Sequence, residues 1–186
     1  VDGLVTVSAD RAVPVVATVA ERLGLASIGS AVAHRMTHKV AMRRCLAEEG
    51  VPQPAFAAVR DLASGRAALE TVALPAVLKP ADSGGQRAVF RVESPGDLES
   101  HLHVALAESP TDEAILEGFV DGIEMNGIVV VRDGTPTVLT LSDRLRPPGP
   151  GFGVGWVHLY PASIFADQLE RAERAAEHAV RALGLR

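Results

Sequence analysis

The 186-residue sequence predicts an α/β or α+β fold with antiparallel strands in its second half. Short apolar runs alternate with segments in which apolar residues recur at helical spacing. Two strand pairs, near Lys79 and Val89 and near Val129 and Val138, are joined by connections too short for parallel crossovers. Both pairs must therefore be antiparallel, which excludes a simple doubly wound parallel sheet.

The composition is that of a soluble globular domain, with 47% hydrophobic and 22% charged residues. The formal net charge of -5 argues against a protein that coats nucleic acid, because such a protein needs a basic face. No apolar run approaches the roughly 18 residues of a membrane-spanning helix. Cys45 is the single cysteine, so no internal disulfide forms, which fits a reducing compartment. We expect a cytoplasmic protein without a nucleic-acid or membrane partner.

The first third of the chain predicts a strand followed by helices. Residues 1–8 are rich in β-branched side chains and are expected to form a buried strand. Residues 10–23 have helical apolar spacing and end before Gly24. Residues 31–50 predict one or two helices, the stronger at residues 36–49, ended by Gly50 and the prolines that follow. The sequence begins within strand-like residues and stops just after its last helix, so we expect a fragment of a longer protein.

The rest of the chain predicts alternating strands and helices. The expected strands cover residues 55–59, 76–78, 88–92, 114–116, 123–131 and 137–141. The expected helices cover residues 64–72, 95–107 and 164–183. Ser94 is a candidate N-cap, Asp133-Gly134 is a strong hairpin turn signal, and residues 146–155 predict a loop rich in Pro and Gly.

A candidate phosphate site follows the strand at residues 76–78. Lys79 ends this wholly apolar strand, so its cation has a defined direction. Gly84 and Gly85 allow the backbone to approach a ligand closely, and successive N–H groups in such a turn can bind an anion. Ser83 and Gln86 add neutral donors. On these residues alone, an ordinary hairpin with a solvated lysine explains the segment equally well.

A second candidate site lies where the next apolar strand ends. Glu117 ends that strand, and Glu124 follows seven residues later, past a glycine. Adjacent peptide groups can read the edge of a flat base, and a nearby carboxylate can accept hydrogen bonds from two ribose hydroxyls. Two solvated acids at a loop edge are the plainer interpretation of this segment alone. Taken together, the two segments favour a nucleoside triphosphate as the ligand.

Three blocks of this sequence, in order and spacing, resemble the ATP-grasp superfamily, in the branch of biotin carboxylase, carbamoyl-phosphate synthetase and the carboxylate–amine ligases. The blocks are Met36-Thr37-His38-Lys39 with the helix that ends at Pro54, Leu74-Pro75-Ala76-Val77-Leu78-Lys79-Pro80 with its glycine loop, and residues 114–124. The resemblance covers nearly the whole chain and implies a partial ATP-grasp fold. Its expected parts are the end of a preceding α/β domain at residues 1–36, a linker helix and small lobe at residues 37–113, and an incomplete large lobe at residues 114–186.

The resemblance implies that the first two blocks bind the phosphates of ATP. Lys79 would contact the α and β phosphates, and Lys39 would reach a phosphate from the helix before the small lobe. The flexible flap over the phosphates would consist of Ser83, Gly84, Gly85 and Gln86. Relatives commonly have Asp before the first lysine, whereas this chain has His38.

The third block is expected to bind adenosine. By the resemblance, the Gly118 carbonyl and the Val120 amide would read adenine, with Glu117 beside them. Glu124 would bind the ribose. Residues 143–146 and the loop after them would place a basic residue toward the substrate or the triphosphate, although a solvated loop explains these charges nearly as well.

The activity implied for the parent protein is that of an ATP-dependent ligase. Such an enzyme activates a carboxylate as an acyl phosphate, which an amine or similar nucleophile attacks. Mg²⁺ is expected in the full-length protein with ligands beyond residue 186, so neither a metal ligand nor a catalytic residue is assigned here. The carboxylate is unknown, a homodimer is left open, and so is catalysis by this chain alone. The alternative is a non-catalytic nucleotide-binding or regulatory module of the same architecture.

Overall fold

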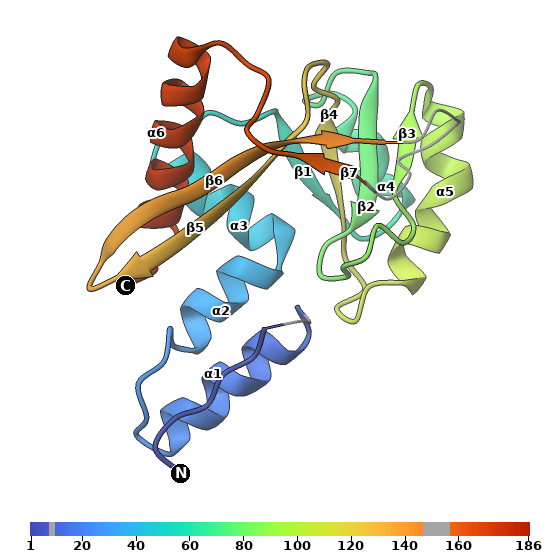
Figure 1. Ribbon diagram of the computed structural model, residues 1–186. Helices are drawn as coiled ribbons and strands as arrows, with labels where there is room; N and C mark the ends of the chain where they lie inside the picture. The colour runs from blue at the N-terminus through green and yellow to red at the C-terminus, as the bar shows by residue number, and fades with distance from the viewer. Residues whose placement is uncertain (8–9, 147–156) are drawn as a thin grey trace.

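The structure, a computed structural model, describes residues 1–7, 10–146 and 157–186. Its helices are α1 (Ala12–Arg22), α2 (Ser30–Thr37), α3 (Lys39–Glu48), α4 (Leu62–Ala68), α5 (Pro95–Ala107) and α6 (Ala166–Ala182). Its strands are β1 (Phe56–Val59), β2 (Ala76–Pro80), β3 (Phe90–Val92), β4 (Ala114–Gly118), β5 (Met125–Arg132), β6 (Thr135–Leu145) and β7 (Val157–Leu159). The strands form two antiparallel sheets (Figure 1), so the predicted mixed fold with antiparallel strands is confirmed.

A four-stranded sheet in the order β1-β4-β2-β3 forms the larger layer, and every neighbouring pair in it is antiparallel. Helices α4 and α5 cover one face, where Leu78 and Leu116 belong to a fully buried cluster with Leu98 of α5 (Figure 1). On the opposite face, Ile115 packs with Val40 of α3. Because successive side chains of a strand point to opposite faces, β2 and β4 contribute to both layers.

The N-terminal segment differs from the prediction. Residues 1–7 form no strand in the described part of the chain, and the side chains of Val1, Val5 and Val7 are largely exposed. A β-branched run becomes a strand when a neighbouring strand accepts its backbone hydrogen bonds, so the local preference alone does not decide the structure. The expected helix at residues 10–23 is confirmed as α1, which lies beside α2 (Figure 1).

Several helix and strand ends move by a few residues, each for a local reason. His38 has an extended backbone that separates α2 from α3, so the stronger helix begins at Lys39 instead of residue 36. Asp61 forms a capping box with Ser64, which starts α4 before the expected residue 64. The positive φ of 50° at Ala88 delays β3 until Phe90. The expected helix at residues 95–107, with Ser94 as its N-cap, is confirmed as α5.

The second sheet contains β5, β6 and β7, and α6 packs against β5 and β6 (Figure 1). Asp133 and Gly134 form the hairpin turn with φ angles of 50° and 73°, which confirms the predicted turn. Leu183, just after α6, packs against Leu46 of α3 and Val51. This small core joins the C-terminal helix to α3. The first strand of the expected large lobe, β4, lies inside the four-stranded sheet. Within the described ranges, no helix combines the length and the apolar character needed to cross a membrane.

Leu116→Ala is expected to lower the free energy of unfolding by about 2–5 kcal/mol, because it leaves a cavity between β4 and the helices that cover it. Leu139→Ala in β6 is the matched control, since this leucine is 58% exposed and its loss should change stability by less than about 0.5 kcal/mol. Urea unfolding of both variants measures the difference. Equal losses would contradict the placement of Leu116 in the core.

Candidate functional site

All of the predicted ATP-binding residues line one cleft with a volume of about 900 Å³. The cleft runs from the start of α3, over the end of β2 and its loop, to the segment after β4 and the end of β6. These residues are Lys39, Lys79, Ser83, Gly84, Gly85, Gln86, Glu117, Gly118, Val120 and Glu124. The structure thus brings together side chains that are far apart in the sequence, while their individual roles stay predictions.

Strand pairing places Lys79 and Glu117 on the same face of the four-stranded sheet. Glu117 of β4 lies opposite Val77 of β2, and Lys79 lies opposite Ile115. Side chains two residues apart share a face, so Lys79 and Glu117 are diagonal neighbours. Lys79 Nζ lies 2.6 Å from Glu117 Oε2. The two candidate segments of the sequence therefore meet in an ion pair.

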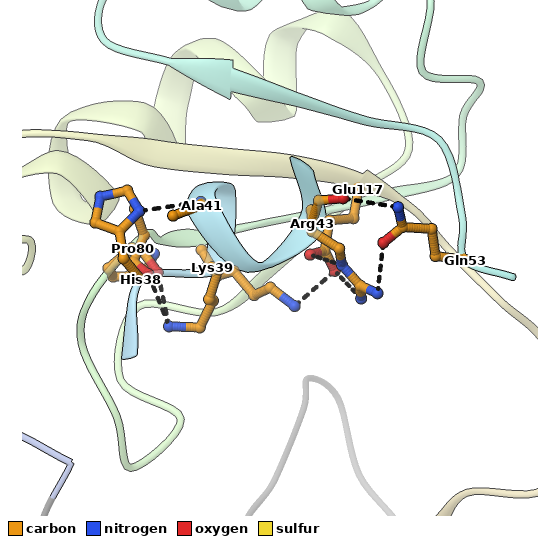
Figure 2. Close-up of polar contacts among 9 residues, drawn as sticks. His38, Lys39, Ala41, Arg43, Gln53, Pro80 and Glu117 are labelled. Carbon is orange, nitrogen blue, oxygen red and sulfur yellow. Dashed lines mark hydrogen bonds and ion pairs between the residues drawn. The ribbon is translucent and has the colours of Figure 1, made fainter. Parts of the chain in front are cut away.

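Arg43 makes a second ion pair with Glu117. Its Nε donates to Oε1 at 2.9 Å and its Nη2 donates to Oε2 at 3.3 Å. Figure 2 shows Arg43 extending from α3 to Glu117, with Gln53 at its outer side. Gln53 accepts from Arg43 Nη1 at 3.4 Å and donates to the Arg43 carbonyl at 2.8 Å. The guanidinium is therefore held from both sides.

These cations determine the charge of Glu117, which is 5% exposed. Burial acts to raise the pKa of the Glu117 carboxyl, but the hydrogen bond from Arg43 and the charges of Lys79 and Arg43 outweigh it. The pKa consequently lies below its ordinary value, and Glu117 is a carboxylate near neutral pH.

Lys39 is directed toward the loop between β2 and β3, which is the predicted flap. Its Nζ donates to the Ser83 carbonyl at 2.8 Å. It also donates to the Pro80 carbonyl at 3.0 Å (Figure 2). Its backbone N–H donates to the Ala81 carbonyl at 2.7 Å. Burial lowers the pKa of Lys39 and the charge of Lys79 lowers it further, against the opposite effect of Asp82. The ammonium group thus joins the start of α3 to the base of the flap.

His38 is the N-cap residue of α3. Its Nδ1 accepts a hydrogen bond from the Ala41 N–H at 3.4 Å, and its Nε2 lies 3.3 Å from Glu113 Oε2. Burial lowers the pKa of His38, although the charge of Glu113 raises it. A neutral imidazole with its proton on Nε2 satisfies both contacts. N-cap side chains usually accept the hydrogen bond through an oxygen, whereas His38 accepts it through a ring nitrogen. Lys39 is then the first residue of the helix.

The two glycines of the flap differ in their surroundings. A Cβ atom on residue 84 would lie 2.5 Å from Asp10 Oδ2, so a larger residue there would displace the Asp10 carboxylate from its present position. Gly85 has a φ of 74°, which L side chains rarely adopt. Ser83, at the base of the flap, is buried. The loop therefore starts from a fixed base and turns sharply over the end of β2.

The segment after β4 is held by backbone hydrogen bonds at its start. The Gly118 N–H donates to the Ala55 carbonyl and the Phe119 N–H donates to the Pro75 carbonyl, both at 2.9 Å. The side chain of Val120, by contrast, is 68% exposed. The peptide groups predicted to read a base thus follow a rigid strand end.

Glu124, the predicted ribose ligand, pairs with two arginines: Arg144 in β6 and Arg146 just after it. Arg144 Nη1 lies 2.5 Å from its Oε1, and Arg146 Nη2 lies 2.5 Å from its Oε2. The Arg144 N–H also donates to the Glu124 carbonyl at 2.9 Å. The basic residues noted in the sequence therefore do line the cleft, whereas residues 147–155 of the expected loop lie outside the described residues.

Two charged residues of the cleft lie beside the predicted ones but were not predicted from the sequence: Arg43 and Asp10. Arg43 lies one helical turn after Lys39, and this spacing places both cations on one face of α3, which was a usable signal. Asp10 reaches the flap through packing of the N-terminal helices, which no local pattern indicates. The cationic lining residues are Lys39, Arg43, Lys79, Arg144 and Arg146, and the acidic ones are Asp10, Glu117, Asp121 and Glu124. The lining has more cations than carboxylates in a chain of net charge -5, as an anion site requires.

No protein-family model matches the chain, but its sequence and its fold are similar to those of known ligases. The chain is 31% identical over 157 residues to a D-alanine–D-alanine ligase of Gloeobacter violaceus, covering 78% of this chain and 50% of that protein. Among solved structures, the L-amino acid ligase from Bacillus licheniformis matches with a TM-score of 0.82 and 27% identity, covering 98% of this chain and 42% of that one. N5-carboxyaminoimidazole ribonucleotide synthetase, solved as an ADP complex, matches with a TM-score of 0.78 and 18% identity, covering 97% of this chain and 46% of that one.

The chain spans half the length of that curated ligase and less than half of each of the two solved chains. The three sequence blocks provide most of the residues that line the cleft: α3 with its linker, β2 with the flap, and β4 with the segment after it. The shared fold, these blocks and the sequence relatives lead to one assignment: the chain belongs to the ATP-grasp superfamily and contains part of its fold.

Proposed function

We propose that the chain binds ATP in this cleft as the ATP-binding part of an ATP-dependent ligase. One observation carries the proposal: Lys39, Lys79, the glycine flap and Glu124 all line the same cleft. Lysine is a compact positive charge that suits phosphate, and the flap supplies backbone N–H groups. A cytoplasmic location is part of the proposal and agrees with the single cysteine, Cys45.

The contacts of the described residues suggest how ATP would be held. Lys79 would turn from Glu117 to the phosphates, and Lys39 would exchange the flap carbonyls for phosphate oxygens. Peptide groups of Gly118 and Val120 would face adenine at the rigid end of β4. Glu124, already oriented by its two arginines, would accept hydrogen bonds from the ribose hydroxyls.

The proposed reaction of the parent protein is carboxylate activation. A carboxylate oxygen attacks the γ-phosphorus, the bond to the bridging oxygen breaks, and ADP leaves. An amine then attacks the acyl carbon of the acyl phosphate, loses its proton, and inorganic phosphate departs. The curated relative and both structural neighbours carry names of ligases or synthetases, and the second neighbour was solved with ADP, which supports this class.

Mg²⁺ is expected to accompany ATP in the parent enzyme. Among the residues that the structure describes, no group of three or more His, Cys, Asp or Glu side chains is arranged to hold a metal ion. These residues therefore do not fit a metal site, and we assign no metal ligand and no metal-dependent step to them.

Lys79→Ala is expected to weaken ATP binding by more than about tenfold, because a charged hydrogen bond to phosphate is lost. Arg132→Ala is the control, since its side chain is 91% exposed in the hairpin of the second sheet. Titration calorimetry with ATP measures both affinities. An unchanged affinity in the Lys79 variant would refute the phosphate assignment.

The affinity for ATP is expected to fall as the pH rises through the pKa of Lys39. Burial lowers this pKa, so the cation is lost at a lower pH than for an ordinary lysine. Arginine stays charged throughout, and the Lys39→Arg variant should therefore lack this decrease. Affinities measured over an alkaline pH series for both proteins test the prediction, and parallel curves would exclude a direct role of Lys39.

Glu124→Ala is expected to lower the affinity for ATP by about tenfold, because the ribose hydroxyls lose a charged acceptor. The loss should be smaller for 2′,3′-dideoxy-ATP, which has no hydroxyls to donate. Comparing the two nucleotides on both proteins separates ribose binding from a general disturbance of the cleft. Equal losses for the two nucleotides would contradict the ribose assignment.

A further inference from the structure

Glu117 pairs with two cations, Lys79 and Arg43. If Lys79 moved to a phosphate, Arg43 would be left as its ion-pair partner among these two. Lys79 Nζ contacts Oε2 at 2.6 Å, while Arg43 contacts both oxygens at 2.9 and 3.3 Å. The carboxylate is 5% exposed, so water offers it little stabilisation. A buried carboxylate without a cation is strongly disfavoured. Any departure of Lys79 therefore requires that another cation stay in place.

Arg43 meets this requirement by its geometry. It engages Glu117 through two nitrogens, and Gln53 holds its third nitrogen and its backbone carbonyl. Its place on α3 joins the helix to Glu117 of β4 (Figure 2). Lys79, by contrast, belongs to β2. Lys79 has one flexible ammonium group in this cluster, and Arg43 has a planar fork in a fixed position.

We propose that Arg43 is a positioning residue that keeps Glu117 neutralised and thereby makes Lys79 available to the phosphates of ATP. This inference rests on the proposed function, because it assumes that Lys79 binds phosphate. It assigns Arg43 an indirect role: the guanidinium acts through Glu117 and makes no contact with the nucleotide. Without Arg43, Glu117 retains Lys79 and the phosphates compete for it.

The pH dependence of binding gives a signature of this role. The charged groups that face Glu117 are Arg43 and Lys39 of α3 and Lys79 of β2. Removing Arg43 removes a hydrogen bond and a charge that lower the Glu117 pKa, so this pKa rises in the variant. Lowering the pH then protonates Glu117 and releases Lys79. The affinity deficit of the Arg43 variant should consequently shrink as the pH falls.

The test compares ATP affinities of the intact protein, Arg43→Met, Glu117→Gln and the double variant by titration calorimetry. Arg43→Met should weaken ATP binding by about tenfold or more in the presence of Glu117, because Glu117 without Arg43 holds Lys79 away from the phosphates. On the Glu117→Gln background the same change should cost less than about threefold, since a neutral side chain does not retain Lys79. Arg44→Met, an exposed residue of the same helix, is the matched control and should bind ATP normally.

Each outcome decides a different point. An equal loss on both backgrounds would overturn the inference, because it would mean that Arg43 contacts the nucleotide or merely stabilises α3. A deficit that does not shrink at lower pH would also overturn it. Arg43→Lys keeps one charge and should lose less affinity than Arg43→Met. Arg43→Gln, which keeps hydrogen-bond donors, permits the same comparison if the methionine variant does not fold. Failure of the intact protein to bind ATP would instead refute the proposed function.

Discussion

The carboxylate of Glu117 is almost removed from water, and burial of such a group costs several kcal/mol unless cations compensate it. Lys79 and Arg43 provide this compensation from β2 and α3. The three elements that form the centre of the cleft are thus joined through one side chain. The same interaction keeps Lys79 at the end of its strand and fixes α3 against the sheet, which places Lys39 beside the flap. The geometry of the candidate site follows from how this buried charge is satisfied.

The four-stranded sheet separates stability from binding by the alternation of its side chains. Leu78 and Leu116 point into the apolar core under α4 and α5, while Lys79 and Glu117 point to the opposite face. The packed apolar face therefore fixes the strands that carry the polar side chains of the other face. The flap differs, because it connects β2 to β3 through residues outside the sheet and starts from contacts with Lys39. The proposed ATP site consequently combines a fixed floor with a loop that leaves the sheet.

Two features of this ATP-grasp chain concern the start of α3 and the charge of the cleft. His38 caps α3 through a ring nitrogen, and burial lowers the pKa of its imidazole, which favours the neutral form. The lining of the cleft is cationic on balance although the whole chain is acidic. Electrostatic attraction for a polyanion thus depends on local placement of charge rather than on net charge.

The sequence by itself determined those features that depend on neighbours in the chain. Ser94 and Pro95 predict the start of α5, Asp133-Gly134 predicts the hairpin turn, and the apolar run before Lys79 predicts β2, because capping, turn geometry and strand alternation act over a few residues. The resemblance added the set of cleft residues. Tertiary structure alone decided the strand order, the exposed coil at residues 1–7, and the pairing of Glu124 with Arg144. It also decided the contact between Arg43 and Glu117, which are 74 residues apart. Such contacts depend on how a helix packs across a sheet, and no local pattern encodes that distance.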